Sequence, residues 1–136
     1  MTDDQTDPGI ETLIAAFYAA FDNRGGRAPA QAALRAMFAD AAVITRVTGA
    51  RVESWTPDAF IAPRVAMLTD GTLTDFHEWE TQARTSVLDR IASRWSRYEK
   101  QGLLDGADYR GGGQKFIQLY RAGDRWLIGA ILWQDD

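Results

Sequence analysis

The N-terminal third of the chain has a helical pattern of apolar residues. The three-and-four spacing typical of one face of an amphipathic helix is met at Ile10, Leu13, Ile14, Phe17, Tyr18 and Phe21. Asp7-Pro8 suits the start of this helix, and Asn23 with Gly25-Gly26 suits its end. A second helix is predicted to start near Pro29, with its buried side formed by Ala33, Leu34, Met37 and Phe38.

The next segment predicts a short strand followed by a third helix. Residues 42–47 are rich in β-branched side chains, which favour a strand. Residues 54–68 return to a helical pattern, with Ser54 or Thr56 as the candidate N-cap and Pro57 in the first turn. Pro63 lies inside this pattern, so we expect a kink or a break there.

After Asp70-Gly71 the apolar period changes from 3.6 to 2, which indicates strands. Residues 73–87 and 91–99 predict a hairpin around Asp89-Arg90, and residues 100–113, rich in Gly and Asp, predict a loop. A final hairpin turns at residues 122–124. Helices gathered on one side of an antiparallel sheet make the predicted fold class α+β.

The last two strands are apolar on both faces, as Phe116, Ile117, Ile131 and Leu132 illustrate. One face of such a hairpin can pack on the helices of the same chain, but the other needs a second cover. The pattern therefore predicts a cupped sheet whose outer face is a subunit interface.

Composition narrows the class of protein. The 136 residues suit a single domain over residues 10–136, preceded by a frayed tail over residues 1–9. The net charge of −4 and the scattered basic residues argue against nucleic-acid binding. No apolar run approaches the roughly 20 residues that span a bilayer, no signal-peptide pattern is present, and there is no Cys. We therefore expect a soluble, cytoplasmic protein without a membrane partner.

The chain resembles the nuclear transport factor 2-like superfamily over roughly residues 10–134. The resemblance rests on the order of the elements and on FYAAFDNR, LRAMFADAAVI and WLIGAILWQDD. Within that superfamily, FIAPR, DFHEWETQAR, IASRWSRYE and GGGQKFIQLYR look most like an uncharacterised bacterial subgroup. Ketosteroid isomerase, scytalone dehydratase and the small polyketide cyclases share this fold.

The resemblance implies N-terminal helices packed on a strongly curved antiparallel sheet, a cystatin-like α+β roll that forms a cone with an internal pocket. It also implies a homodimer through the sheet face. Some members are enzymes and many have no known activity. The motifs match no catalytic set residue by residue, so the resemblance assigns no catalytic role here.

Counting from a two-residue turn at Asp89-Arg90 divides the first long hairpin into two faces. The face predicted to point toward the core and pocket carries His77, Trp79, Thr81, Ala83 and Val87 with Ala92, Arg94, Ser96 and Tyr98. Glu78, Glu80, Arg84 and Arg97 fall on the other face. A β-bulge would exchange these assignments.

Six residues are candidates for ligand binding: Tyr18, Arg46, His77, Ser96, Tyr98 and Gln118. His77 could be a general acid or base, or a strand histidine that is merely hydrogen-bonded or solvated. Arg46 could bind a carboxylate or block the sheet edge. Gln118 could contact a ligand or a second subunit. Glu78 and Glu80 could approach a cation or supply a carboxylate base, although ion pairing with Arg is the commoner role.

The sequence thus predicts a homodimeric domain that binds a small apolar or carboxylate-bearing ligand. It would need no cofactor or metal, and it could act as a lyase, isomerase or cyclase by proton transfer. A non-catalytic dimerisation or interaction module without a ligand is the alternative.

Overall fold

A computed structural model describes residues 5–136. The helices are α1 (Pro8–Ala19), a short 3-10 helix η1 (Arg24–Gly26), α2 (Gln31–Ala36) and α3 (Pro57–Thr69). The strands are β1 (Phe38–Thr48), β2 (Arg51–Trp55), β3 (Leu73–Leu88), β4 (Ile91–Leu104), β5 (Ala107–Ala122) and β6 (Arg125–Asp135). None of these helices has the length and apolarity that crossing a bilayer requires.

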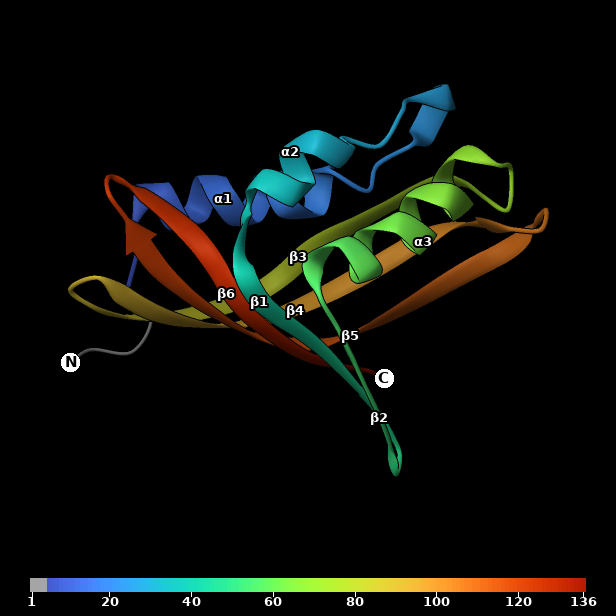
Figure 1. The fold of residues 1–136 in the computed structure, drawn as a ribbon. Helices are drawn as coiled ribbons and strands as arrows, with labels where there is room; N and C mark the ends of the chain where they lie inside the picture. Colours follow the sequence, from blue (N-terminus) through green and yellow to red (C-terminus); the bar gives the residue numbers. More distant parts are fainter. Residues whose placement is uncertain (1–4) are drawn as a thin grey trace.

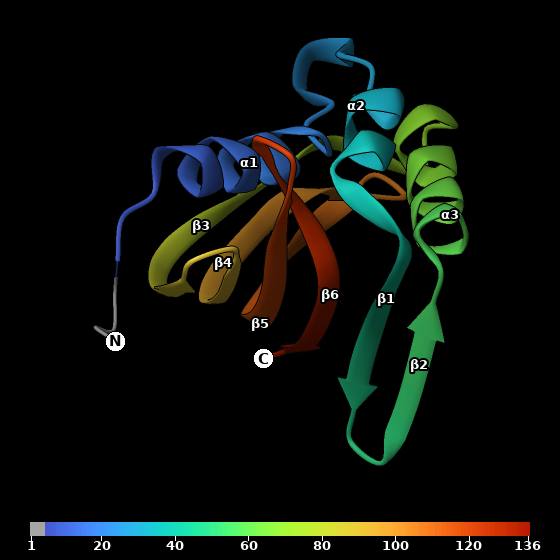
Figure 2. The ribbon, with the colours of Figure 1, turned by 60° about the vertical axis from the view of Figure 1, so that its left-hand side comes forward.

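The six strands form one curved sheet in the order β2-β1-β6-β5-β4-β3. Strands β3 to β6 are a meander of antiparallel neighbours, whereas β1 runs parallel to β6, so the sheet is mixed. All the helices lie on its concave side, and the tip of the β1–β2 hairpin projects away from them (Figures 1 and 2). The predicted α+β class with helices on one face is confirmed.

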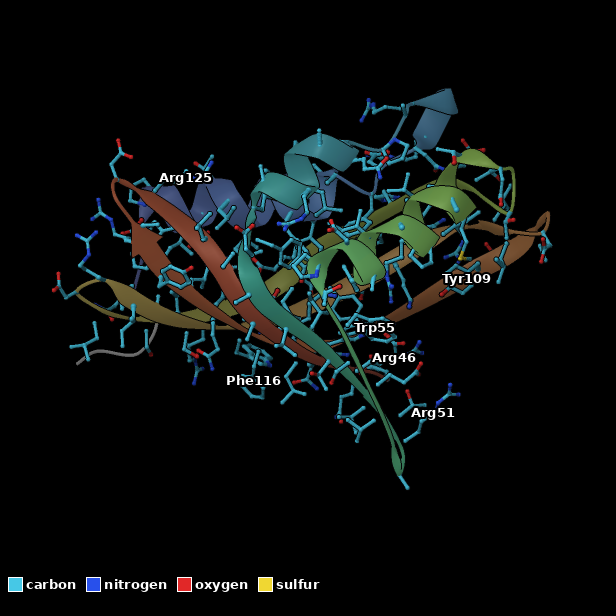
Figure 3. All side chains as sticks on the ribbon, in the orientation of Figure 1. Arg46, Arg51, Trp55, Tyr109, Phe116 and Arg125 are labelled. Carbon is cyan, nitrogen blue, oxygen red and sulfur yellow. The ribbon has the colours of Figure 1, made fainter. Side chains whose placement is uncertain are left out.

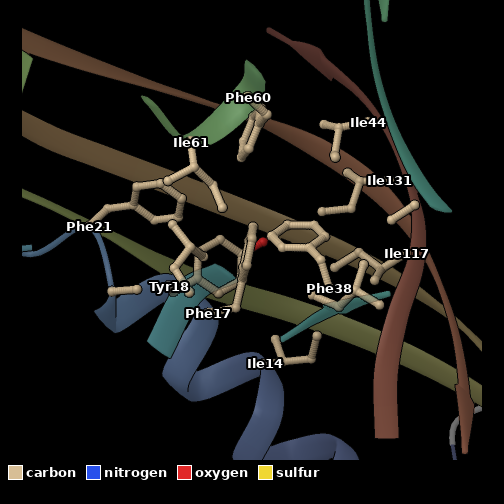
Figure 4. Packing of buried hydrophobic residues seen from close by; sticks show 14 of the residues in the cluster. Ile14, Phe17, Tyr18, Phe21, Phe38, Ile44, Phe60, Ile61, Ile117 and Ile131 are labelled. Atoms are coloured by element: carbon tan, nitrogen blue, oxygen red, sulfur yellow. The ribbon is translucent and has the colours of Figure 1, made fainter. Parts of the chain in front are cut away.

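The core lies between α1 and the concave face of the sheet (Figure 4). The predicted apolar face of the first helix is confirmed, because Ile10, Ile14, Phe17 and Phe21 are all buried. Their partners on the sheet include Ile44, Ile117 and Ile131, which come from β1, β5 and β6. In α2, Leu34 is buried while Ala33, expected on the same side, is exposed.

The predicted helix boundaries follow from their caps. Asp7 accepts hydrogen bonds from the backbone N–H groups of Gly9 and Ile10, and Pro8 occupies the first turn of α1. Thr56 and not Ser54 caps α3, through a 3.2 Å hydrogen bond from the Ala59 N–H. The expected break at Pro63 is absent, since α3 continues through it to Thr69.

Asn23 joins three segments at the end of α1. Its side-chain amide donates to the carbonyls of Leu68 and Leu73 at 2.9 and 2.8 Å. Its side-chain oxygen accepts from the Phe76 N–H at 2.8 Å. The end of α1, the end of α3 and the start of β3 are therefore fixed relative to one another.

Two predicted boundaries were wrong. Residues 100–113, predicted as a loop, form the end of β4 and the first half of β5, joined by a turn at Asp105-Gly106. Both turn residues have positive φ, at 50° and 81°, which explains the Asp-Gly pair. Residues 51–55, of which 54–55 were expected to begin the third helix, are strand β2.

The register of the first hairpin is as predicted at its turn, where Leu88 pairs with Ile91. The inward face of β4 is also confirmed, because Ala92, Arg94, Ser96 and Tyr98 are buried. In β3 a register shift between Glu80 and Gln82 exchanges the faces, as an extra residue in a bulge must. The prediction that His77 and Trp79 face the pocket is therefore wrong, and Glu78 and Glu80 take that side.

Candidate functional site

A cavity of about 330 Å³ opens between α3, the end of α1 and the concave face of the sheet. Its volume lies at the small end of the range typical of small-molecule sites. Aromatic residues are the largest group in its wall, namely Phe17, Phe21, Phe60, Phe76, Tyr98, Tyr109 and Trp133. Helix α3 adds Pro63, Met67 and Leu68.

The same wall holds more basic than acidic side chains. The four basic residues are Arg46, Arg64, Lys100 and Lys115, and the two acidic residues are Glu78 and Asp135. These six residues come from six elements, namely β1, α3, β3, β4, β5 and β6. The cavity wall therefore combines charged side chains from parts of the chain that are far apart in the sequence.

Asp135 is the centre of one polar cluster. Its carboxylate accepts a short hydrogen bond from the Tyr98 hydroxyl, a 3.0 Å bond from Arg46 Nη2 and a 3.4 Å contact from Lys100 Nζ. Burial alone would raise the pKa of Asp135, but the Tyr98 hydrogen bond and the charges of Lys100 and Arg46 lower it below its ordinary value. Burial and the Asp135 charge raise the pKa of Tyr98, so its hydroxyl stays protonated.

Gly113 makes this cluster possible. It lies in β5 between Tyr98 on β4 and Asp135 on β6, with which it is paired in the sheet. A Cβ at this position would lie 2.5 Å from the Tyr98 hydroxyl and would also clash with the Gln134 carbonyl oxygen. Residues 111–113 belong to the stretch that was predicted as a loop, but they are strand residues, and the absence of a side chain at Gly113 leaves room for the Tyr98 hydroxyl.

Arg64 has no acidic partner within the described part of the chain. Its Nη1 donates to the Phe60 carbonyl at 2.9 Å, and its guanidinium lies 4.0 Å from the centre of the Phe60 ring. Burial, with the neighbouring charge of Arg46, lowers the pKa of Arg64 to about 10. The guanidinium remains charged at neutral pH, and most of its donors are not used by protein acceptors.

Lys115 is the second basic residue of the cavity wall that has no acidic partner among residues 5–136. It is 6% exposed, and its Nζ lies 4.0 Å from the centre of the Tyr98 ring. The rings of Phe17, Tyr18 and Trp133 lie 5.5 to 5.8 Å away. Burial lowers the pKa of Lys115 below that of an ordinary lysine.

A second polar cluster lies nearby under α1 and is closed by its own contacts. Arg94, which is 2% exposed, donates to Glu80 at 2.6 and 3.0 Å and to Glu11 at 2.9 and 3.1 Å. Ser96 donates to Glu80 at 2.6 Å, and the hydroxyls of Tyr18 and Ser96 are 2.7 Å apart. Burial alone would lower the pKa of Arg94, but its hydrogen bonds to Glu80 and Glu11 raise it.

The six predicted ligand-binding residues thus fall in three places. Tyr98 and Arg46 line the cavity. Tyr18 and Ser96 belong to the Arg94 cluster, which uses their hydroxyls. His77 and Gln118 lie on the convex face, where the His77 ring stacks on Trp79 at 4.5 Å.

Sequence reasoning missed four of the charged residues of the cavity: Arg64, Lys100, Lys115 and Asp135. One signal could have found Lys115, because a basic residue that alternates with Ile117 and Leu119 must point to the core side of β5.

Glu78 and Glu80 were proposed as a possible metal pair. They share the concave face, but Glu80 is held by Arg94, and no group of three or more His, Cys, Asp or Glu side chains in the described residues is placed to hold a metal.

Comparisons with known proteins add information on the fold. The sequence matches no model of a known protein family and no curated protein. Among solved structures, a putative scytalone dehydratase from Novosphingobium aromaticivorans aligns with a TM-score of 0.73 at 11% identity, over 94% of this chain and 82% of that one.

Two further structures match over nearly their whole length. A putative Ca/calmodulin-dependent kinase II association domain from Exiguobacterium sibiricum has a TM-score of 0.74 at 10% identity and covers 97% and 98% of the two chains. A nuclear transport factor 2-like protein from Cytophaga hutchinsonii has a TM-score of 0.71 at 11% identity and covers 93% and 95%. The chain therefore has the nuclear transport factor 2-like fold, the cystatin-like cone that the sequence motifs indicated.

Proposed function

We propose that this chain binds a small organic anion with a flat, apolar body in the cone cavity. The observation that carries the proposal is that two basic residues of the cavity wall, the half-buried Arg64 and the buried Lys115, have no acidic partner among the described residues. A buried charge without a counter-ion costs several kcal/mol, so a ligand that supplies a negative charge would bind strongly there. Arg is well suited to binding a carboxylate through two parallel hydrogen bonds.

The empty volume favours ligand binding over a purely structural role. A module that used its sheet only for association would be expected to fill its interior with its own side chains. Here about 330 Å³ remains free, and charged groups line it. The carboxylate of Asp135 already accepts contacts from Tyr98, Arg46 and Lys100. The acceptor atoms of a ligand would therefore bind Arg64 and Lys115, which have no such partner.

Titration calorimetry with 2-naphthoate and its uncharged amide tests this proposal. We expect the carboxylate to bind at least about tenfold more tightly, because a hydrogen bond to a charged group contributes roughly 1.5–3 kcal/mol. Arg64→Met, which keeps an apolar stem over the Phe60 ring, is expected to remove that preference. Glu78→Gln is expected to strengthen carboxylate binding severalfold, because it removes a like charge from the cavity wall.

Arg51→Met is the matched control, since Arg51 lies on the exposed β1–β2 hairpin (Figure 3) and contacts Glu53. It should leave both affinities unchanged. Equal affinity for the acid and the amide, or an unchanged preference in Arg64→Met, would contradict the proposal.

The catalytic form of this function is a lyase or isomerase that works by proton transfer without a cofactor. Glu78 supports it, because this carboxylate lines the cavity and forms no hydrogen bond or ion pair in the part of the chain that the structure describes. A free carboxylate beside buried basic groups can accept a proton from a carbon next to a carbonyl. Deuterium uptake at that carbon, followed by NMR, separates catalysis from binding alone.

We also propose that the convex face pairs with a second copy of the chain. Trp95, Phe116 and Leu132 form a row across β4, β5 and β6, and the last two are 54% and 47% exposed. Phe116 points away from the helices (Figure 3). The positions around Phe116 and Leu132 are uncharged, namely Val43, Thr45, Ser93, Gln114, Gln118 and Ala130, whereas Arg84 and Arg97 lie beside Trp95 at one end of the row. A symmetric interface places a patch against itself, and an uncharged centre allows this without like-charge repulsion.

Light scattering coupled to size-exclusion chromatography measures the assembly directly. We expect a dimer at micromolar concentration and a monomer for Phe116→Glu, which places a charge in the centre of the patch. Ala33→Glu, on the exposed side of α2, should leave the dimer intact. A wild-type monomer at these concentrations would refute this part of the proposal.

A further inference from the structure

Both lysines of this protein line the cavity. The chain has 15 basic residues, of which Lys100 and Lys115 are the two lysines and the others are arginines. The distinction matters because a guanidinium stays protonated, whereas an amine that loses its proton becomes a nucleophile. Amine chemistry by a side chain is therefore confined to this cavity.

The two lysines have different surroundings. Lys100 Nζ lies 3.4 Å from an oxygen of Asp135. Burial alone would lower the pKa of Lys100, but Asp135 raises it, so Lys100 remains an ammonium ion. Lys115 has no such contact within residues 5–136, and it is pressed among four aromatic rings.

The rings around Lys115 do not supply the missing counter-ion. A desolvated ammonium gains some stabilisation from an aromatic face. Removing the same charge from water costs more than that gain. The nearby charges of Lys100 and Arg64 oppose a third positive charge, while Glu78 and Asp135 favour it. Burial lowers the pKa of Lys115 and so favours loss of its proton, while the rings hold the amine in place on the cavity wall.

We propose that Lys115 forms an imine with the carbonyl group of a carboxylate-bearing ligand, such as an oxo acid or an aldehyde acid. The inference rests on the proposed function, because the carboxylate of the ligand would be held by Arg64 while its carbonyl carbon reaches Lys115. Four features carry it: the burial of Lys115, its place on the cavity wall, its lack of an acidic partner among the described residues, and the contrast with Lys100.

The step is balanced without an oxidant or a reductant. The lone pair of Nζ adds to the carbonyl carbon, a C–N bond forms, and the carbonyl oxygen becomes a hydroxyl group. The C–O bond then breaks, and the oxygen leaves as water with both hydrogens of the amine. Glu78 is the free carboxylate in the same cavity that can carry protons between these atoms.

Reductive trapping tests the proposal. The wild-type protein is treated with 4-carboxybenzaldehyde and cyanoborohydride at pH 7, and the adducts are located by peptide mass spectrometry. We expect Lys115 to be labelled at least about tenfold faster than Lys100, since one pKa unit changes the fraction of neutral amine tenfold. In urea-unfolded protein the two rates should become similar. Benzaldehyde, which lacks the carboxylate, should label Lys115 more slowly.

Three variants and a competitor complete the test. Arg51→Met, outside the cavity, should keep the labelling of Lys115 within about threefold, and Arg64→Met should slow it about tenfold. Lys115→Met should leave only the adducts seen at other amines, with circular dichroism confirming that it folds. 2-Naphthoate should protect Lys115. Labelling of both lysines at similar rates in the folded protein would overturn the proposal.

The two proposals fail in different ways. If 2-naphthoate binds in calorimetry and Lys115 is not trapped, the imine proposal is wrong and anion binding stands. If neither binding nor trapping occurs, both are wrong.

Discussion

Arg94→Met is expected to lower the free energy of unfolding by about 3 kcal/mol, because breaking a buried ion pair from one side leaves an uncompensated charge. Arg94 holds Glu80 and Glu11 with four hydrogen bonds and also donates to Thr85 at 2.8 Å. Glu11 can be solvated after the change, because 43% of its side chain is exposed. Most of the lost free energy therefore comes from leaving the more buried Glu80 without a partner. This cluster connects α1 to β3 and β4, and its loss weakens the packing of the helix.

Urea unfolding followed by tryptophan fluorescence measures this change. Arg51→Met removes an exposed pair with Glu53 and is expected to cost less than 1 kcal/mol. The double variant Arg94→Met/Glu80→Leu should recover part of the loss, since an apolar pair can replace a buried ion pair. Equal stability of Arg94→Met and Arg51→Met would show that the cluster does not hold the helix.

Gly113→Ala is expected to abolish ligand binding in the cavity and to lower the free energy of unfolding by about 1–3 kcal/mol, the range for overpacking a tight site. The added Cβ would meet the Tyr98 hydroxyl and the Gln134 carbonyl oxygen. The Tyr98 ring must then move away from Asp135, and it carries the surface on which Lys115 rests. The carboxylate of Asp135 would lose its shortest hydrogen bond.

Calorimetry with 2-naphthoate and urea unfolding report the two effects separately. Gly129→Ala is a suitable control, because a Cβ there meets the Tyr120 ring at 3.4 Å, near ordinary contact distance, and lies outside the cavity. It should leave ligand binding unchanged. Wild-type affinity in Gly113→Ala would show that the position of Tyr98 does not shape the ligand site.

Local patterns predicted the elements well where side-chain periodicity is regular. The spacing of Ile10, Ile14 and Phe17 corresponds to the buried face of α1, and the period of two in residues 91–98 corresponds to the buried face of β4. Asp89 tolerates the positive φ of 51° that its turn requires, so Leu88 and Ile91 face each other as counted. These features depend on neighbours in the sequence.

The faces of β3 could not be counted across its bulge. One extra residue near Thr81 exchanges every side chain beyond it, which is why His77 was placed inside and Glu78 outside. Glycine-rich residues 107–113 suggested a loop for a similar reason. The glycines in this segment lie so close to neighbouring strands that a side chain there would collide with Tyr98, Lys100 or Asp136. The need for glycine therefore comes from residues on other segments.

The polar groups of the cavity are brought together by distant parts of the chain. Arg46 and Asp135 are 89 residues apart, and Tyr98 and Asp135 are 37 apart. Whether a basic residue is paired or unpaired depends on such contacts, so the difference between Lys100 and Lys115 is not contained in the sequence around either. Tyr98 was placed on the inward face by strand periodicity, whereas the sequence left Arg46 open between a cleft residue and an edge charge, and the structure places it at the cavity.

Strand β6 lies in the middle of the sheet, between β1 and β5, although it is formed by residues 125–135. During synthesis on the ribosome, the edges of β1 and β5 that pair with β6 stay uncovered until this segment has been made. Open strand edges invite pairing with other chains, and contacts between distant residues form slowly. A nascent or truncated chain that lacks β6 is therefore expected to aggregate and to need chaperone protection until the central strand is inserted.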